Sequence, residues 1–324
     1  MADVSLIEQL DQAVQAMIAG RAAMLPHANL APLIGIAAEL RELPREEFRA
    51  RLKHELEKKT STASEVKPAV DPIRKGFRTV TPYLVVREIH EVIEFVQNVF
   101  GAEGKIYGTG SEGGLHSEYK IGDSMIMIGG GPNLRRAAQP AALHIYVEDV
   151  DAVYARALQA GATSLHAPMD QEYGERSAAF DDPGGNRWYP ATYKGAHYIP
   201  EGLPNLMPYL HPRGAARQID FLKQAFGAEE IDRHESPDGI IYHAKVRIGN
   251  SIIEMGEAHD QWQPMRAMFM LYVDDVDAWY ARAMKAEGAI SIGEPANQPY
   301  GDRVGGLKDP FDNVWYIGSH IKDV

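Results

Sequence analysis

The sequence of 324 residues contains no cysteine. Disulfide bonds, catalysis by a thiolate and zinc sites with cysteine ligands are therefore excluded. A long apolar run is also missing, since the most apolar stretch, 30–40, has about half of the ~20 residues that a membrane-spanning helix needs. The net charge is −12, and an excess of negative charge argues against nucleic acid or an anionic membrane as the main partner.

The first residues, 1–5, show no basic start followed by an apolar core, so a secretory signal is not indicated. Together with the absence of cysteine, this predicts a cytoplasmic protein. Hydrophobic residues make up 45% and charged residues 24% of the chain, a balance that is typical of globular domains. The length predicts two or three of them.

What the sequence does contain is a long internal repeat. The segment 82–129 recurs as 208–256, and single-residue insertions shift the offset between 126 and 127 positions. A repeat of this length is much longer than the roughly 20–50 residues of a solenoid unit, so it predicts a duplicated domain. Matching residues include Pro82 and Pro208, Phe100 and Phe226, Gly101 and Gly227, Asp182 and Asp309, and Trp188 and Trp315.

The repeat does not include the N-terminal part of the chain. Residues 1–58 have apolar side chains at helical spacing and predict a helical extension. Residues 59–75 have no such period and are interpreted as a linker. The extension is expected to pack on the rest of the chain or on a second subunit, or to dock another protein, and the residues do not separate these alternatives.

Each repeat predicts two modules of the order βαβββ. In the first module a strand at 79–86 precedes a helix at 91–101 that ends at a glycine, and short strands follow at 116–121 and 124–128. A second module begins at 142, and the same order fills the second repeat. The fold class is therefore α+β, with four modules arranged in two pairs.

Paired modules with these motifs resemble the vicinal-oxygen-chelate superfamily, which includes glyoxalase I, extradiol dioxygenases and bleomycin-resistance proteins. The sequences of the motifs are most similar to those of its PhnB-like branch. The resemblance covers 76–324 and implies tandem glyoxalase-like domains at 76–198 and 199–324, in each of which two modules form a curved sheet around a cleft. The motifs that carry it are Pro82-Tyr83-Leu84, Phe100-Gly101-Ala102-Glu103, Tyr173-Gly174-Glu175-Arg176 and Asp182-Pro183-Gly184-Gly185-Asn186, with their counterparts in the second repeat.

The resemblance also implies where a metal ion would be held. Metal-dependent members use one position near the start and one near the end of each module, usually His, Gln or Glu. These positions fall on Thr81, Met127, His144 and Tyr189 in the first domain, and on Met207, Glu254, Met270 and Tyr316 in the second. Only His144 and Glu254 are good ligands, whereas a catalytic zinc usually has three. A joint site of these two would require a shared cleft wall, which swapped pairing of the modules allows.

Polar residues on the cleft side of the strands are the candidate ligand-binding residues. Strand alternation places His243 and Lys245 on the cleft face, with His116 and Glu118 in the first repeat. Histidine can act as an acid or base near neutral pH and arginine can hold an anion or a carbonyl. The alternatives are histidines without a chemical task and arginines that pair with nearby acids such as Asp182 or Asp309. The predicted cleft residues are His116, Glu118, His144, Tyr146, Arg176, Tyr189, His243, Lys245, Glu254, Arg303 and Tyr316.

Two residues depart from the family pattern, and two large ones are assigned to the core. Asp312 stands where glycine is usual, which predicts a different turn in the second half. Pro190 stands where a β-branched residue is usual, which predicts a strand end or an edge strand. Trp188 and Trp315, which follow Asp-Pro turns, are predicted core residues.

We expect a protein that binds a small organic molecule in a cleft, without a complete metal site and without a cofactor. One alternative is a metal-dependent lyase or isomerase of the glyoxalase type, or a dioxygenase, that uses Zn, Ni, Fe or Mn in a reduced or rearranged site. Another is a scaffold that acts through residues 1–58. The expected partner is a small molecule, with no nucleic acid and no membrane, and the expected state is a monomer or a homodimer.

Overall fold

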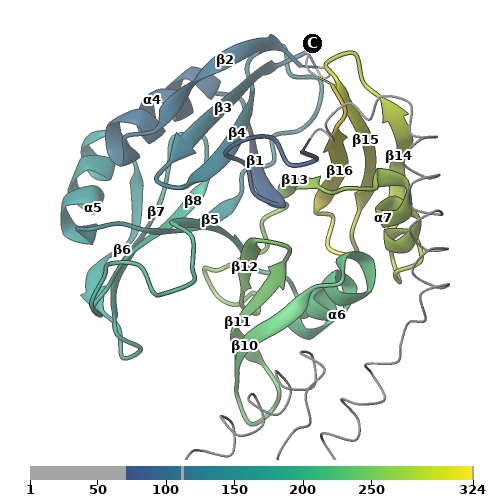
Figure 1. Ribbon diagram of the computed structural model, residues 1–324. Coiled ribbons are helices and arrows are strands. Elements are labelled where there is room, and N and C mark those ends of the chain that lie inside the picture. Colours follow the sequence, from purple (N-terminus) through teal and green to yellow (C-terminus); the bar gives the residue numbers. More distant parts are fainter. Residues whose placement is uncertain (1–70, 111–112, 323–324) are drawn as a thin grey trace, which may run out of the picture. The chain divides into compact units, whose positions relative to one another are not determined.

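The computed structural model describes residues 71–110 and 113–322, which form two sheets and the helices that connect their strands (Figure 1). The predicted helices of residues 1–58 and most of the predicted linker lie outside the described residues. No helix in the described part is long and apolar enough to cross a membrane.

The described residues form four βαβββ modules, as predicted. The first consists of β1 (Val80–Val86), α4 (Ile89–Phe100), β2 (Glu103–Thr109), β3 (Leu115–Ile121) and β4 (Ser124–Gly130). The second consists of β5 (Ala142–Tyr146), α5 (Val150–Gln159), β6 (Thr163–Asp170), β7 (Glu175–Asp181) and β8 (Arg187–Tyr193).

The second repeat has the same order. Its first module consists of β9 (Leu206–Leu210), α6 (Ala215–Phe226), β10 (Glu229–Glu235), β11 (Ile241–Ile248) and β12 (Ser251–Met255). The last module consists of β13 (Met268–Tyr272), α7 (Val276–Ala283), β14 (Ile290–Asn297), β15 (Asp302–Lys308) and β16 (Val314–His320).

Local sequence signals account for the helices. The buried face of α4 includes Val92, Phe95 and Val99, which follow at helical spacing, and the helix ends where Gly101 adopts a left-handed φ of 66°. At the start of α5 the Asp149 carboxylate accepts a hydrogen bond of 3.0 Å from the Ala152 N–H. This is the expected role of an N-cap aspartate, and Asp275 repeats it at α7.

The pairing of modules differs from the expected one. The order in sheet 1 is β14-β15-β16-β13-β1-β4-β3-β2, and the order in sheet 2 is β10-β11-β12-β9-β5-β8-β7-β6. The first module therefore shares a sheet with the last one, and the two middle modules share the other. The prediction that 76–198 and 199–324 each form a sheet of their own is wrong, although each sheet does contain two modules.

The reason lies in the edge that each module leaves open. Within a module the first strand is outermost, so it can pair with the first strand of any other module. In the structure β1 pairs antiparallel with β13 and β5 with β9. The first two modules instead meet through their cores, where the rings of Phe100 and Trp188 lie 4.5 Å apart. All four edges look alike in a repeated sequence, so the pattern alone does not select the partner.

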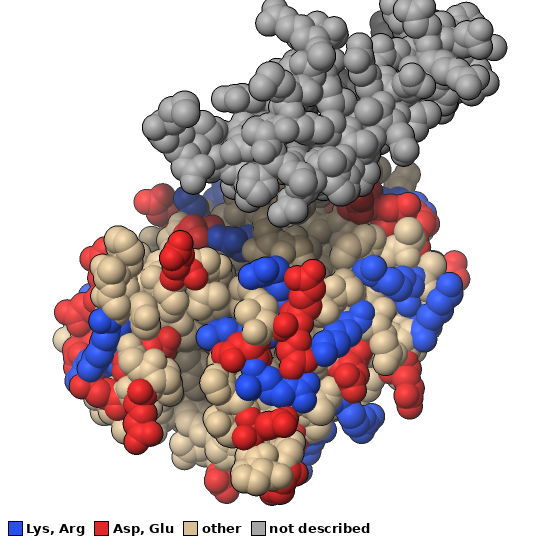
Figure 2. All heavy atoms as spheres, turned by 60° about the horizontal axis from the view of Figure 1, so that its bottom comes forward, with Lys and Arg blue, Asp and Glu red and all other residues tan. Residues whose placement is uncertain are grey.

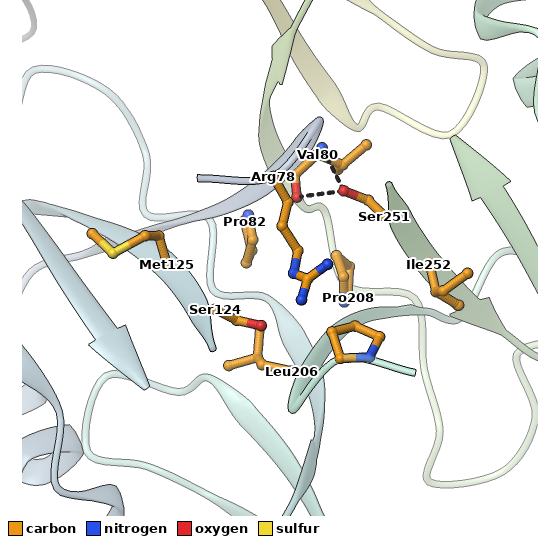
Figure 3. A pocket seen from close by; sticks show the side chains of 10 residues that line it. Arg78, Val80, Pro82, Ser124, Met125, Leu206, Pro208, Ser251 and Ile252 are labelled. Atoms are coloured by element: carbon orange, nitrogen blue, oxygen red, sulfur yellow. Dashed lines mark hydrogen bonds between the residues drawn. The ribbon is translucent and has the colours of Figure 1, made fainter. Parts of the chain in front are cut away.

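The two sheets meet where Val80 of β1 lies beside Ser251 of β12 (Figure 3). The Val80 N–H of sheet 1 donates a hydrogen bond of 2.8 Å to Ser251 Oγ of sheet 2. The cavity beside them has a volume of about 10 Å³, which is enough for no more than a water molecule. This contact joins the sheets and does not provide space for a ligand.

The predicted core residues are confirmed, while the two departures from the family pattern have different outcomes. Trp188 and Trp315 are fully buried. Asp312 keeps the left-handed turn, with a φ of 65° where Gly185 has 81°, so the prediction of a different turn is wrong. Pro190 lies inside β8, between β5 and β7, so it is not at an edge. The pairing of β7 with β8 passes from Ser177 and Ala191 directly to Phe180 and Trp188, so no β7 residue is paired with Pro190 and its missing N–H is tolerated.

Candidate functional site

The swapped pairing brings four of the family's metal positions onto one face of sheet 2. His144 pairs with Met207 of β9 and with Tyr189 of β8, while Glu254 lies on β12, the strand on the other side of β9. The two good ligands, predicted for separate domains, therefore share a sheet. We call this surface, which carries His144, Tyr189, His243, Lys245 and Glu254, the site face.

His144 and Glu254 form a buried ion pair. His144 Nδ1 lies 2.7 Å from Glu254 Oε2, and both side chains are almost inaccessible to water. Burial alone would raise the pKa of Glu254, but the charge and hydrogen bond of His144 outweigh it and lower that pKa to about 2. Burial alone would lower the pKa of His144, but Glu254 outweighs it and raises that pKa. Both shifts of pKa favour the ionised form of the pair.

The second oxygen of the Glu254 carboxylate is buried and has no hydrogen-bond partner. The Lys245 ammonium lies 3.6 Å and His243 Nε2 lies 3.9 Å from this Oε1 atom. Both distances are too long for a hydrogen bond. A carboxylate oxygen that is kept from water without a donor is costly, so this atom is the most evident place for a bound group on the site face.

A second polar group on this face lacks a partner. The Tyr189 hydroxyl lies 2.7 Å from His211 Nε2, while His211 Nδ1 is buried and unpaired. Burial and the charge of Arg187 lower the pKa of His211 to about 3, so the ring is neutral. When the hydroxyl donates to Nε2, the ring proton resides on Nδ1, which then offers a free N–H.

Aromatic rings surround these groups. The ring of Tyr209 lies 5.1 Å from that of Tyr189 and 4.7 Å from that of His211, and Trp262 stacks on His211 at 6.1 Å. The Tyr146 ring lies 4.6 Å from that of His144, and its hydroxyl donates a hydrogen bond of 2.7 Å to Glu175. The site face thus combines a buried carboxylate with flat apolar surfaces.

The family's metal-binding arrangement does not fit these residues. His144 and Glu254 are the strong ligands among the four positions, and they bond to each other. The other two positions carry Tyr189 and Met207, and a thioether suits soft cations. A catalytic zinc site needs three protein ligands, so the four positions of sheet 2 supply one too few.

The equivalent face of sheet 1 is filled by the chain itself. Its four positions carry Thr81, Met127, Met270 and Tyr316. The segment that precedes β1 packs there, with Ile73 and Phe77 against these methionines. The corresponding positions of the two sheets therefore differ both in residue type and in what covers them.

An ion pair holds that segment in place. Both terminal nitrogens of the Arg74 guanidinium donate to the buried Glu118 carboxylate, one of them over 3.0 Å. Burial alone would raise the pKa of Glu118, but His116 and Arg74 lower it to about 2. His116 in turn bonds the Tyr83 hydroxyl over 2.8 Å. Of the predicted site residues, His116 and Glu118 thus have partners within the chain.

Three more of the predicted cleft residues, Tyr316, Arg176 and Arg303, bond to partners other than His144 and Glu254. The Tyr316 hydroxyl accepts a hydrogen bond of 3.3 Å from Arg136. Arg176 pairs with Asp151 and Asp170 at the surface, and Arg303 pairs with Asp277. The six that the structure brings together on sheet 2 are His144, Tyr146, Tyr189, His243, Lys245 and Glu254.

His211, Tyr209 and Trp262 were missed from the sequence. A signal for His211 was available in the repeat, because this residue stands where the first half has Val85. A polar aromatic residue that replaces a buried valine at a strand end marks a difference between the copies. Trp262 lies in a loop, and its sequence carries no pattern that would place it over a sheet.

A separate hollow of about 470 Å³ lies away from the site face, between the end of α4 and the strand β5. The side chain in it that is best suited to hold an anion, Arg156, already donates to the Val99 carbonyl over 3.0 Å. Its arginine is therefore already engaged within the chain.

The sequence of this chain is similar to those of known proteins. The sequence profile of the Glyoxalase/Bleomycin resistance protein/Dioxygenase superfamily matches residues 77–189 and 212–317. An uncharacterized protein of Mycobacterium bovis is 34% identical over 132 residues, which cover 37% of this chain and 86% of the relative. A protein of Mycobacterium tuberculosis has the same identity, with 77% of its length covered.

Solved structures agree on the fold. Glyoxalase I from Zea mays superposes with a TM-score of 0.59 at 14% identity, over 75% of this chain and 92% of that one. A putative dioxygenase from Bacillus subtilis superposes with a TM-score of 0.51 at 12% identity, over 75% and 85%. The tandem glyoxalase-like fold is confirmed, and the chain belongs to the Glyoxalase/Bleomycin resistance protein/Dioxygenase superfamily.

Proposed function

We propose that the chain binds a small organic molecule on the site face of sheet 2, with Glu254 as the main polar anchor. The observation that carries the proposal is the buried, unpartnered Oε1 atom of this carboxylate. A ligand that donates an O–H or N–H to it removes the cost of leaving it unpaired. The molecule is therefore expected to carry such a donor.

Neighbouring groups indicate the rest of the ligand. Lys245 and the free ring nitrogen of His211 favour an oxygen acceptor. The rings of Tyr189, Tyr209 and Trp262 favour a flat apolar part. A compact hydroxylated carbonyl or aromatic compound combines these properties, without a cofactor.

The test compares the two sheets. A ligand-observed NMR screen of the full chain would use a set of hydroxy acids, catechols and bleomycin as probes. Glu254→Met places on sheet 2 the residue that sheet 1 has at Met127, and it is expected to weaken every probe that binds by about tenfold or more, the contribution of a hydrogen bond to a charged group. Met127→Leu is the matched control and should leave binding unchanged.

Two results would reject the proposal: no probe binds the wild-type chain, or the bound probes bind Glu254→Met equally well. Thermal unfolding of each variant checks that the loss of binding does not come from loss of the fold.

A metal-dependent lyase, isomerase or dioxygenase is the second candidate. It is favoured by the convergence of His144 and Glu254 on one face, and weakened by the shortage of a third ligand. It predicts activity in a glyoxalase I or dioxygenase assay with added Zn, Ni, Fe or Mn, lost in His144→Ala and Glu254→Ala. An assay that shows no turnover with any of these ions removes this candidate.

Several finer expectations remain predictions from the sequence. They are membership of the PhnB-like branch, a cytoplasmic location, no nucleic-acid or membrane partner, and a monomeric or homodimeric state. The scaffold alternative rests on residues 1–58, which lie outside the described residues.

A further inference from the structure

Three metal-ligating side chains meet on the hairpin of β10 and β11, beside the site face. Asp232 and His234 are two residues apart on β10, so they point to the same side. His243 is the cross-strand partner of His234. One donor atom from each of the three lies within 4.8 Å of the others.

Their spacing is close to what a cation requires. His234 Nε2 lies 3.1 Å from Asp232 Oδ2. In a tetrahedral zinc site with bonds of about 2.0–2.1 Å, the donor atoms lie about 3.3 Å apart. Asp232 and His234 already have this spacing, and the donor atom of His243 lies within 4.8 Å of both. His234 and Asp232 are exposed by 54% and 39%, so water has access to a fourth position.

The buried carboxylate of Glu254 lies next to one member of the cluster, His243. His243 Nε2 lies 3.9 Å from the unpartnered Glu254 Oε1. Metal-ligating histidines commonly donate their other ring N–H to a carboxylate, which fixes the ring and strengthens the ligand. The present 3.9 Å is too long for a hydrogen bond, and a movement of the His243 ring toward Oε1 on metal binding would let Glu254 accept one.

The side chains around β10 and β11 carry charges of both signs, which argues against non-specific binding of cations to an acidic surface. The side of the molecule that carries β10 and β11 is turned forward in Figure 2, where acidic and basic side chains lie close together. On β10 itself, Glu230 pairs with Lys223 and Arg233. Affinity at this place would therefore come from the two imidazoles, which suit Zn²⁺ and similar ions.

We propose that Asp232, His234 and His243 bind one divalent cation of the zinc class. The site is distinct from the four family positions, and three protein ligands with an open fourth position are typical of a catalytic zinc site. The sequence carries a signal for it in Asp232-Arg233-His234 followed by His243. The proposal does not depend on the organic ligand, because the three side chains can hold an ion without one.

Calorimetric titration of the chelator-stripped full chain with Zn²⁺ tests it. We expect one tight equivalent in the wild type, with affinity reduced at least about tenfold in Asp232→Asn, His234→Ala and His243→Ala. The control is His259→Ala, which removes an exposed histidine 3.3 Å from a single carboxylate, Asp260. Its affinity should equal that of the wild type.

A second readout reports on the ligands directly. Co²⁺ should give the visible absorption of a four-coordinate site in the wild type and lose it in His234→Ala, whose exposed side chain leaves the fold intact. The proposal is overturned when His234→Ala binds Zn²⁺ as the wild type does, when no equivalent binds, or when His259→Ala loses as much affinity. The NMR screen is independent, so failure of either proposal leaves the other testable.

Discussion

His144 Nδ1 and Glu254 Oε2 lie 2.7 Å apart, although the first belongs to the second module and the other to the third. The contact exists because β5 and β9 pair at the centre of sheet 2. It joins the two halves of the duplicated chain through charged side chains that are nearly inaccessible to water.

Replacing one member of this pair should destabilise the protein strongly. Glu254→Met leaves the His144 side chain buried without its partner, and breaking a buried ion pair typically costs about 3–5 kcal/mol. Urea unfolding followed by circular dichroism measures this loss.

The double variant His144→Met with Glu254→Met should recover most of that stability. It copies the residues at the equivalent positions of sheet 1, Met270 and Met127, and apolar replacement of a buried ion pair is often neutral. A double variant as unstable as the single one would show that the pair contributes mainly through packing.

Removing Arg74 should release the segment that covers sheet 1. Arg74→Ala leaves the buried Glu118 carboxylate without its main partner, and we expect a loss of about 2 kcal/mol, reduced from the fully buried case because Arg74 is 29% exposed. Hydrogen exchange of residues 71–77 should increase at the same time.

The matched control is Arg303→Ala, which breaks a surface pair with Asp277. Exposed pairs contribute little, so its stability should be close to that of the wild type. Equal losses in both variants would contradict a special role of Arg74.

The stability that Glu118 provides should depend on pH. Its pKa is lowered from 4.5 to about 2 in the folded state, so its contribution is present above about pH 4.5 and is lost as the pH falls toward 2. The difference in unfolding free energy between the wild type and Glu118→Gln should narrow across this range. A difference that stays constant from pH 5 to pH 3 would count against the ionised pair.

Asp312→Gly should stabilise the protein. Asp312 has a φ of 65°, and a residue with a side chain is unfavourable in this left-handed region by about 1–2 kcal/mol, part of which glycine returns as unfolded-state entropy. We expect a gain of about 0.5–1 kcal/mol in thermal or urea unfolding. The mirror variant Gly185→Ala, at the equivalent turn, should lose a similar amount. A loss of stability in Asp312→Gly, or a gain in Gly185→Ala, would be inconsistent with this explanation.

The sequence was sufficient to predict the four modules, but not which modules pair with each other in a sheet. The spacing of Val92, Phe95 and Val99 and the stop at Gly101 determine α4 locally, so that helix could be predicted within two residues. Pairing of β1 with β13 depends on which of several similar edges comes into contact, and no local pattern encodes that choice.

The same limit explains the outcome for the candidate site. Strand alternation placed His144 and His243 on a sheet face, and the family's metal positions singled out Glu254. Assigning His144 and Glu254 to one surface required the module pairing. His211 and Trp262 were missed because their roles arise from neighbours on other strands and loops.

The interleaved order of the modules has a consequence for half-length proteins of this type. A chain that ended at residue 198 would carry the free edges of β1 and β5 with no β13 or β9 to cover them. Two such chains could satisfy each other's edges across a twofold axis, which reproduces both sheets. The single chain thus holds within itself the arrangement that such a dimer would have, and its two sheets, unlike those of a symmetric dimer, can carry different residues at equivalent positions.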